Sequence, residues 1–356
     1  YRILHHAQEV LLLFVDDGQS EKERSRFIIQ LEHELFSAPG SCPQRSTLRP
    51  AMPTRPHPPR EVAKSAALLE AVRRHAERGL SPSALSSFVR CPLDYYYRYL
   101  VNVHDAQDRG AGLGNDEVGT VVHSALERIY SPYRGQNIDP KGLADSIRGI
   151  PHLLRSCLPT DITAEEGTPL LQLGMARHAL ERAVRTEIRH LEAGNEIILL
   201  GLETELDHPL PPVTDEPVFP PVRVKGRIDR IDVRKGLVNL VDMKTGSTDA
   251  RELNLRTLDL EVIDARHTKA LQLLIYSWLY LNRHPDTPCV RASILPLRSS
   301  GSPDGIPLVI AGEENVYRGQ LPTIAALLRS VVDRMVDPRA PFRHEPTSAY
   351  CRICME

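Results

Sequence analysis

Hydrophobic residues recur along the chain at two spacings, and the alternation between the two predicts the order of elements. Spacing of three or four positions, typical of a helix with one buried face, marks four segments: 118–129, 171–194, 268–282 and 320–335. Short segments with the length and composition of strands lie at 197–206, 222–233, 237–244 and 288–296. The second half of the chain therefore predicts an α/β fold in the order helix, three strands, helix, strand.

A proline-rich stretch marks the main boundary along the chain. Residues 37–60 combine many prolines with glycine, serine and arginine, a composition that buries too little apolar area to fold alone. We expect a linker there, with a separate piece at 1–36 and the main domain at 61–356. The first piece contains an apolar run at 9–15, which predicts a strand, and a helix is expected to start near Ser20.

The main domain is expected to open with two helices. The first begins near Glu61 and ends near Gly79, and Ser81 followed by Pro82 supplies the cap and first-turn proline of the second.

The segment VKGRIDRIDVRKGLVNLVDMKTG contains two strands joined by a tight turn. A two-residue loop at Lys235 and Gly236 is the simplest arrangement, because Gly236 tolerates the positive φ that such a turn needs. Counting back from that loop, Asp229 faces Asp242, and Lys244 lies on the same face two residues further on. Asp232 falls on the opposite face.

Opposed carboxylates repel each other unless something neutralises them, and a hard divalent cation does so. Mg²⁺ or Mn²⁺ prefers carboxylate oxygen and water ligands and keeps positions open for phosphate oxygens. An ammonium group beside such a cation can orient a water or stabilise charge on a phosphate. Arg227, opposite Lys244 in this register, is a further candidate for phosphate contact. A surface hairpin with scattered charges is the alternative that the hairpin alone leaves open.

Composition narrows the class of protein without identifying its ligand. Of 356 residues, 41% are hydrophobic and 25% are charged, as in a soluble globular protein, and the formal net charge of −2 gives no global sign of nucleic-acid binding. No apolar run reaches the roughly 18 residues that cross a bilayer, and no signal peptide is evident. We expect a cytoplasmic protein without a membrane partner and, since the chain opens at Tyr1, a fragment.

The GRID segment followed by VDMKTG resembles the PD-(D/E)xK nucleases of the RecB and AddB type. The resemblance implies a restriction-endonuclease-like core with added helices, and it implies metal binding by Asp229 and Asp242 with Lys244 catalytic. GTVVHSALERIY is similar to the family's upstream helix, which makes His123 a metal ligand. QLLIYSWLY is similar to its Q-x-x-x-Y helix, which brings Gln272 and Tyr276 into the site. The backbone carbonyl of Met243 is a further ligand by the same analogy.

Six cysteines lie along the chain, and only Cys351 and Cys354 form a tight pair. Together with Cys91-Pro92 far upstream, this pair resembles the AddB arrangement around a [4Fe–4S] cluster, which implies a cysteine-clamped terminus. Such a cluster needs a fourth thiolate that this chain does not contain at the matching position. Truncation, loss of the last ligand, or the absence of a cluster all fit, and an incomplete site can still take zinc.

The resemblance extends to the amino-terminal piece, where EVLLLFVDDGQSEKERSRFIIQLEHEL resembles the end of the helicase-like part of AddB-type proteins. It implies a Mg²⁺-dependent deoxyribonuclease acting on DNA in double-strand break repair, with a helicase–nuclease partner subunit. A local cationic groove is expected around the site, with arginines of the 171–194 helix. The alternatives are a non-catalytic DNA-binding or scaffold subunit with a degenerate nuclease fold, and a zinc-stabilised interaction module.

Overall fold

The computed structural model describes most of the chain from residue 61 onwards. The described residues are 61–103, 113–160, 162, 164–212, 222–259, 263–297 and 302–345, and nearer the N-terminus 6, 10–12, 26–30 and 46. Contacts divide the chain into two units, Tyr1–Pro56 and His57–Glu356.

The first unit is described only in short stretches. Helix α1 (Arg26–Gln30) lies within the helix expected after Ser20. Residues 10–12, in the middle of the apolar run, are exposed and carry no strand pairing, so these three residues do not form the buried strand predicted there. An apolar run becomes a strand only where a partner supplies hydrogen bonds. The rest of that run and the predicted linker, apart from Ser46, lie outside the described residues.

A mixed sheet forms the centre of the second unit. Its strands are β2 (Ile197–Pro209), β3 (Arg223–Arg234), β4 (Leu237–Lys244), β6 (Cys289–Pro296), β7 (Ile306–Pro307) and β9 (Asn315–Tyr317). The order is β2-β3-β4-β6-β7, with β9 also pairing β6. Strand β3 is antiparallel to both β2 and β4, and β6 runs parallel to β4. All four longer strands lie where their apolar patterns predict.

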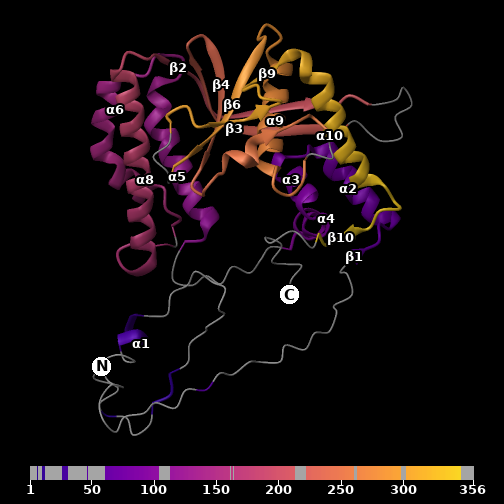
Figure 1. The fold of residues 1–356 in the computed structure, drawn as a ribbon, viewed down its shortest axis with the longest axis horizontal. Helices are drawn as coiled ribbons and strands as arrows, with labels where there is room; N and C mark the ends of the chain where they lie inside the picture. The colour runs from indigo at the N-terminus through magenta and orange to yellow at the C-terminus, as the bar shows by residue number, and fades with distance from the viewer. Residues whose placement is uncertain are drawn as a thin grey trace. The chain divides into compact units, whose positions relative to one another are not determined.

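Helices cover both faces of this sheet and enclose a separate apolar core on each (Figure 1). On one side lie α5 (Asn115–Tyr130), α6 (Pro140–Ser146), α7 (Ile150–Ser156) and α8 (Gly167–Glu192). On the other lie α2 (Ala66–Arg78), α3 (Pro82–Arg90), α9 (Thr268–Arg283) and α10 (Leu321–Val336). Within the described part of the chain, none of the helices has both the length and the apolar character to cross a membrane.

The β3–β4 hairpin has the register that its turn predicts. Arg234 pairs with Leu237 and Arg230 with Val241. Both loop residues have positive φ, 51° at Lys235 and 77° at Gly236, as a type I′ turn requires.

Several short elements have no counterpart in the sequence pattern. These are α6, α7, α4 (Pro92–Tyr95), the π-helical turn η3 (Tyr96–Val101), β1 (Glu61–Val62), β5 (Asn254–Leu255), β8 (Val309–Ile310) and β10 (Phe342–Arg343). They are too short for apolar periodicity to show, and tertiary packing specifies them. Strands β1 and β10 pair with each other, which joins the two ends of the described unit.

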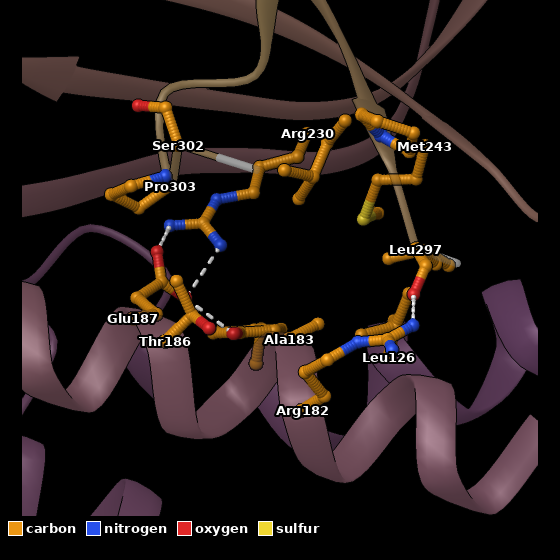
Figure 2. A pocket seen from close by; sticks show the side chains of 13 residues that line it. Leu126, Arg182, Ala183, Thr186, Glu187, Arg230, Met243, Leu297, Ser302 and Pro303 are labelled. Atoms are coloured by element: carbon orange, nitrogen blue, oxygen red, sulfur yellow. Dashed lines mark hydrogen bonds and ion pairs between the residues drawn. The ribbon is translucent and has the colours of Figure 1, made fainter. Parts of the chain in front are cut away.

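A buried ion network fixes α8 to the sheet (Figure 2). Glu187 on α8 receives two hydrogen bonds from the Arg230 guanidinium, at 2.7 and 3.0 Å, and another from the Tyr130 hydroxyl. Arg230 and Arg234 also contact Asp232, at 2.8 and 3.0 Å. Burial alone would raise the pKa of the Glu187 carboxyl, but the charge and hydrogen bonds of Arg230 outweigh burial and lower this pKa to about 2.

We expect Glu187→Gln to lower the free energy of unfolding by about 3 kcal/mol at pH 7, since it leaves buried arginines short of a counter-charge. A carboxyl with a depressed folded-state pKa stabilises fully above its unfolded pKa of about 4.5, and this contribution disappears as the pH falls to about 2. The gap between wild type and variant should therefore close over this range in urea titrations. Glu192→Gln, exposed on the same helix, is the control; a gap of the same size at every pH would contradict the assignment.

Candidate metal-dependent active site

The site forms where β3 and β4 part. Their ladder ends at Arg230 and Val241, and the Met243 amide instead donates a 2.6 Å hydrogen bond to Oδ2 of Asp229. Strand β4 continues beside β6, where Lys244 pairs with Pro296. A side chain has thus replaced a backbone acceptor, and the carboxylate of Asp229 is fixed beside the end of β4.

His123 approaches this point from α5. Its Nε2 lies 2.8 Å from the Met243 carbonyl oxygen, and its Nδ1 lies 3.5 Å from Oδ1 of Asp229 and 3.5 Å from Oε1 of Glu203. With Nε2 donating to the carbonyl, Nδ1 is the nitrogen that faces the carboxylates. Burial would lower the pKa of His123, but hydrogen bonds to Asp229 and Glu203 outweigh burial and raise it to about 10.

Glu203 is the site residue that the sequence pattern did not single out. His123, Glu203 and Asp229 offer ligand atoms that all lie within 4.8 Å of one another. The backbone of Glu203 has a φ of 47°, uncommon for a residue with a side chain, and the β2–β3 register shifts just before it, between Leu199 and Gly201. In the sequence, Glu203 and Glu205 lie two residues apart on one predicted strand, so the pattern places both on the same face. The irregular backbone at Glu203 is what the sequence pattern does not show.

Asp242 and Lys244 form the other half of the site. Asp242 is 1% exposed, and the Lys244 ammonium lies 3.0 Å from its Oδ2. Burial is the main reason that the pKa of Asp242 is raised to about 6; Asp229 raises it further and Lys244 opposes the rise. Burial would lower the pKa of Lys244, yet the charge of Asp242 outweighs it and the pKa is raised. The protonated amine of Lys244 therefore lies next to the carboxylate of Asp242, which takes up a proton more readily than an ordinary aspartate does.

Helix α9 positions Asp242 from the opposite side. The Gln272 amide nitrogen is 2.8 Å from Oδ1 of Asp242 and 2.7 Å from the Tyr276 hydroxyl. This approach depends on Gly226 of β3, since a Cβ there would lie 2.9 Å from the Leu279 side chain and 3.1 Å from the Tyr276 ring. The glycine of the GRID segment thus lets α9 pack closely enough for Gln272 to reach the carboxylate.

Two other charged residues of the hairpin differ in their relation to this cluster: Asp232 lies away from it, and Arg227 borders it. Asp232 belongs to the buried ion network with Arg230 and Arg234. Arg227 contacts Oε2 of Glu203 at 2.7 Å. The hairpin ladder ends before it could pair Arg227 with Lys244. The Met243 carbonyl, expected as a further ligand, accepts the hydrogen bond from His123.

The cluster has the donors that a hard divalent cation requires. Two buried carboxylate oxygens, Oε1 of Glu203 and Oδ2 of Asp242, accept no well-aligned hydrogen bond although each lies beside a basic group. Buried polar atoms without a hydrogen bond indicate an absent ion or water. Carboxylate oxygens with one imidazole nitrogen suit Mg²⁺ or Mn²⁺. The residues present therefore fit such a cation.

Of the three cysteines predicted to bind a [4Fe–4S] cluster, the structure describes only Cys91. Cys91 is buried at the start of α4, with its sulfur 3.6 Å from Nδ1 of His344. His344 follows β10 directly, and β10 contacts α4, of which Cys91 is the N-cap. Cys351 and Cys354 lie outside the described residues, so the cysteine-clamped terminus stays a prediction.

Comparison with known proteins agrees with the geometry at family level. The pattern of the PD-(D/E)XK nuclease superfamily matches residues 79–355. This range contains His123, Glu203 and Asp229, called the metal cluster below, as well as the Asp242–Lys244 pair. No curated protein matches the chain. Because the superfamily pattern covers well over half of the sequence, the chain belongs to the PD-(D/E)XK nuclease superfamily.

Proposed function

We propose that this protein is a Mg²⁺-dependent deoxyribonuclease that hydrolyses phosphodiester bonds. The observation that carries the proposal is the partly buried cluster of His123, Glu203 and Asp229 next to the Asp242–Lys244 pair. Three acidic groups and one amine at the point where two strands part suit a divalent cation and the phosphate that it binds. Family membership supports nuclease chemistry in general.

In this mechanism His123, Glu203 and Asp229, whose ligand atoms lie within 4.8 Å of one another, would hold the cation. Asp242, outside that group, would be a further ligand, as the motif implies. Bound Mg²⁺ or Mn²⁺ polarises a phosphoryl oxygen and lowers the pKa of a water. The protonated Lys244 orients that water and stabilises the negative charge that develops on the phosphate. Gln272 keeps the Asp242 carboxylate in one orientation, while the Met243 carbonyl fixes the ring of His123. Arg227, 58% exposed beside Glu203, is available to a phosphate.

The finer biological assignment rests on the motifs. GRID, VDMKTG and the Q-x-x-x-Y helix resemble the nuclease domain of RecB and AddB-type helicase–nucleases, and an exonuclease role in double-strand break repair follows from that resemblance. On this proposal residues 61–356 form the nuclease domain, residues 1–36 end a helicase-like part, and a partner subunit supplies the motor.

We expect the purified protein to degrade linear DNA with Mg²⁺ and to lose this activity in EDTA. Asp242→Ala and Lys244→Ala should each reduce the rate by about 10²–10³-fold, because each removes a charge that acts in the transition state. Gel analysis of end-labelled DNA measures this. Asp259→Ala is the control, an acidic residue in the segment between β5 and α9. Equal activity in all four proteins would defeat the enzyme proposal and favour a scaffold with a degenerate site.

Glu203→Gln should weaken Mn²⁺ binding by at least about tenfold, because it removes a charged ligand from the cluster. Isothermal titration calorimetry of Mn²⁺ binding measures the effect. Glu205→Gln makes the same change two residues along β2 at an exposed position and should bind Mn²⁺ as wild type does. Equal affinities in the two variants would remove Glu203 from the ligand set.

We further propose that Cys91, Cys351 and Cys354 bind a [4Fe–4S] cluster. Burial of Cys91 and its closeness to the segment after β10 support a site at this end of the domain. Protein purified without oxygen should contain iron and sulfide and should show a broad absorption band in the visible spectrum. Cys91→Ser should lose the iron, the sulfide and the band. Zinc in place of iron would identify the interaction-module alternative, and no metal at all would reject a metal site here.

A further inference from the structure

A polar groove opens beside the metal cluster. It encloses about 310 Å³ and shares two residues with the active site, Lys244 and Gln272. The other described residues lining it are Ser83, Ser86, Ser87, Arg90, Arg98, Tyr99, Thr268 and Lys269. We call it the serine–arginine groove. Helix α3 and the first turn of α9 both contribute lining residues, and the two helices pack against each other (Figure 1).

Basic side chains outnumber the carboxylates at the groove by four to three, because Arg90 and Arg98 share Asp94 while Lys244 pairs with Asp242 and Lys269 with Glu252. Four of the described lining residues are basic, and none of them is acidic. The basic side chains come from three separate parts of the chain: Arg90 and Arg98 around α4, Lys244 at the end of β4, and Lys269 in the first turn of α9. The formal charge of the whole chain is −2, so this excess of positive charge is local. An excess of one sign of charge at a groove attracts ligands of the opposite sign.

A buried carboxylate holds the two arginines in place. Asp94 is 0% exposed and accepts hydrogen bonds from Arg90 at 3.0 Å, from Arg98 at 2.8 Å and from the Ser87 hydroxyl at 2.7 Å. The side chains of Arg90 and Arg98 keep 29% and 37% of their surface exposed. Two guanidinium groups fixed from below and open to solvent form a prepared site for an anion, because little side-chain entropy is lost when the anion binds.

Hydroxyl groups add neutral hydrogen-bonding partners along the same walls. Ser83 and Ser86 come from α3 and Thr268 from α9. The Ser86 hydroxyl bonds to the Thr268 backbone carbonyl at 3.2 Å, which closes the groove between the two helices. Arginine, lysine and serine or threonine side chains are the common donors to phosphate oxygens in nucleic-acid complexes.

We propose that the serine–arginine groove binds a phosphodiester of single-stranded DNA next to the bond that is cleaved, which rests on the function proposed above. Lys244 belongs to both places, so a phosphate in the groove would adjoin the phosphate at the metal cluster. Arg90 and Arg98 are positioning residues here: they hold the strand and do not touch the reacting atoms.

The size and depth of the groove favour a single strand over a duplex. A volume of about 310 Å³ is at the small end of ligand pockets, which suits one nucleotide unit. Asp242 is 1% exposed, so the phosphate must descend to reach it. A flexible single strand can follow such a path, and positively charged grooves are the usual means of binding one.

Binding without catalysis tests the groove. In EDTA, Arg90→Gln and Arg98→Gln should each weaken binding of a labelled twelve-thymidine oligonucleotide by about tenfold, the loss of one charged hydrogen bond. The slope of log affinity against log salt should fall by about 0.7 for each lost contact. Each variant leaves Asp94 one arginine and Ser87, and thermal melting checks folding. Arg329→Gln, in a matched arginine–aspartate pair on α10, should bind as wild type does.

Two results would overturn the proposal. Equal affinity and equal salt slope in the groove variants and in Arg329→Gln would show that DNA does not contact the groove. Binding of a blunt hairpin duplex as tight as that of the oligonucleotide would refute the single-strand assignment. Because the binding series needs no cleavage, wild-type protein that binds the oligonucleotide through the groove but never cleaves DNA with Mg²⁺ would instead refute the proposed nuclease activity.

Discussion

The hydrogen bond from the Met243 amide to the Asp229 carboxylate is the interaction on which the site depends. Up to Arg230 and Val241 the two strands satisfy each other through backbone groups. One step further, a side chain takes over as acceptor and the strands separate. The opening admits the imidazole of His123, which then bonds to the carbonyl of the same Met243 residue. A defect in the ladder is thereby converted into a place where several charged groups can meet.

These groups are held together at an electrostatic cost. Glu203, Asp229 and Asp242 repel one another, and the basic partners His123, Lys244 and Arg227 each offset part of this repulsion. Burial raises the pKa of Asp242 to about 6, and the carboxylates of Asp229 and Glu203 raise the pKa of His123, so both groups hold a proton more readily than usual. A divalent cation supplies positive charge without the proton, and metal binding is therefore coupled to proton release.

Much of the fold could be predicted because its signals are local. The turn at Gly236 fixed the hairpin register, and the apolar faces of α8 and α9 were long enough to show their period. Glu203 was not predicted in this way, because its place in the cluster follows a register shift whose sequence signal is a single glycine, Gly201, inside a strand pattern. The arginines at positions 90 and 98 do carry a signal, being four residues on either side of Asp94, but only the structure reveals that Asp94 is buried between them.

Arg230 and Asp229 are adjacent in the chain, yet one anchors helix α8 through Glu187 and the other belongs to the metal cluster. The anchor of helix α8 and the metal cluster are therefore joined by the peptide unit between Asp229 and Arg230 of β3. A displacement of α8 along the sheet would pull on that unit and change the distances within the cluster. The position of α8 on the sheet and the geometry of the cluster are therefore mechanically coupled through residues 229 and 230.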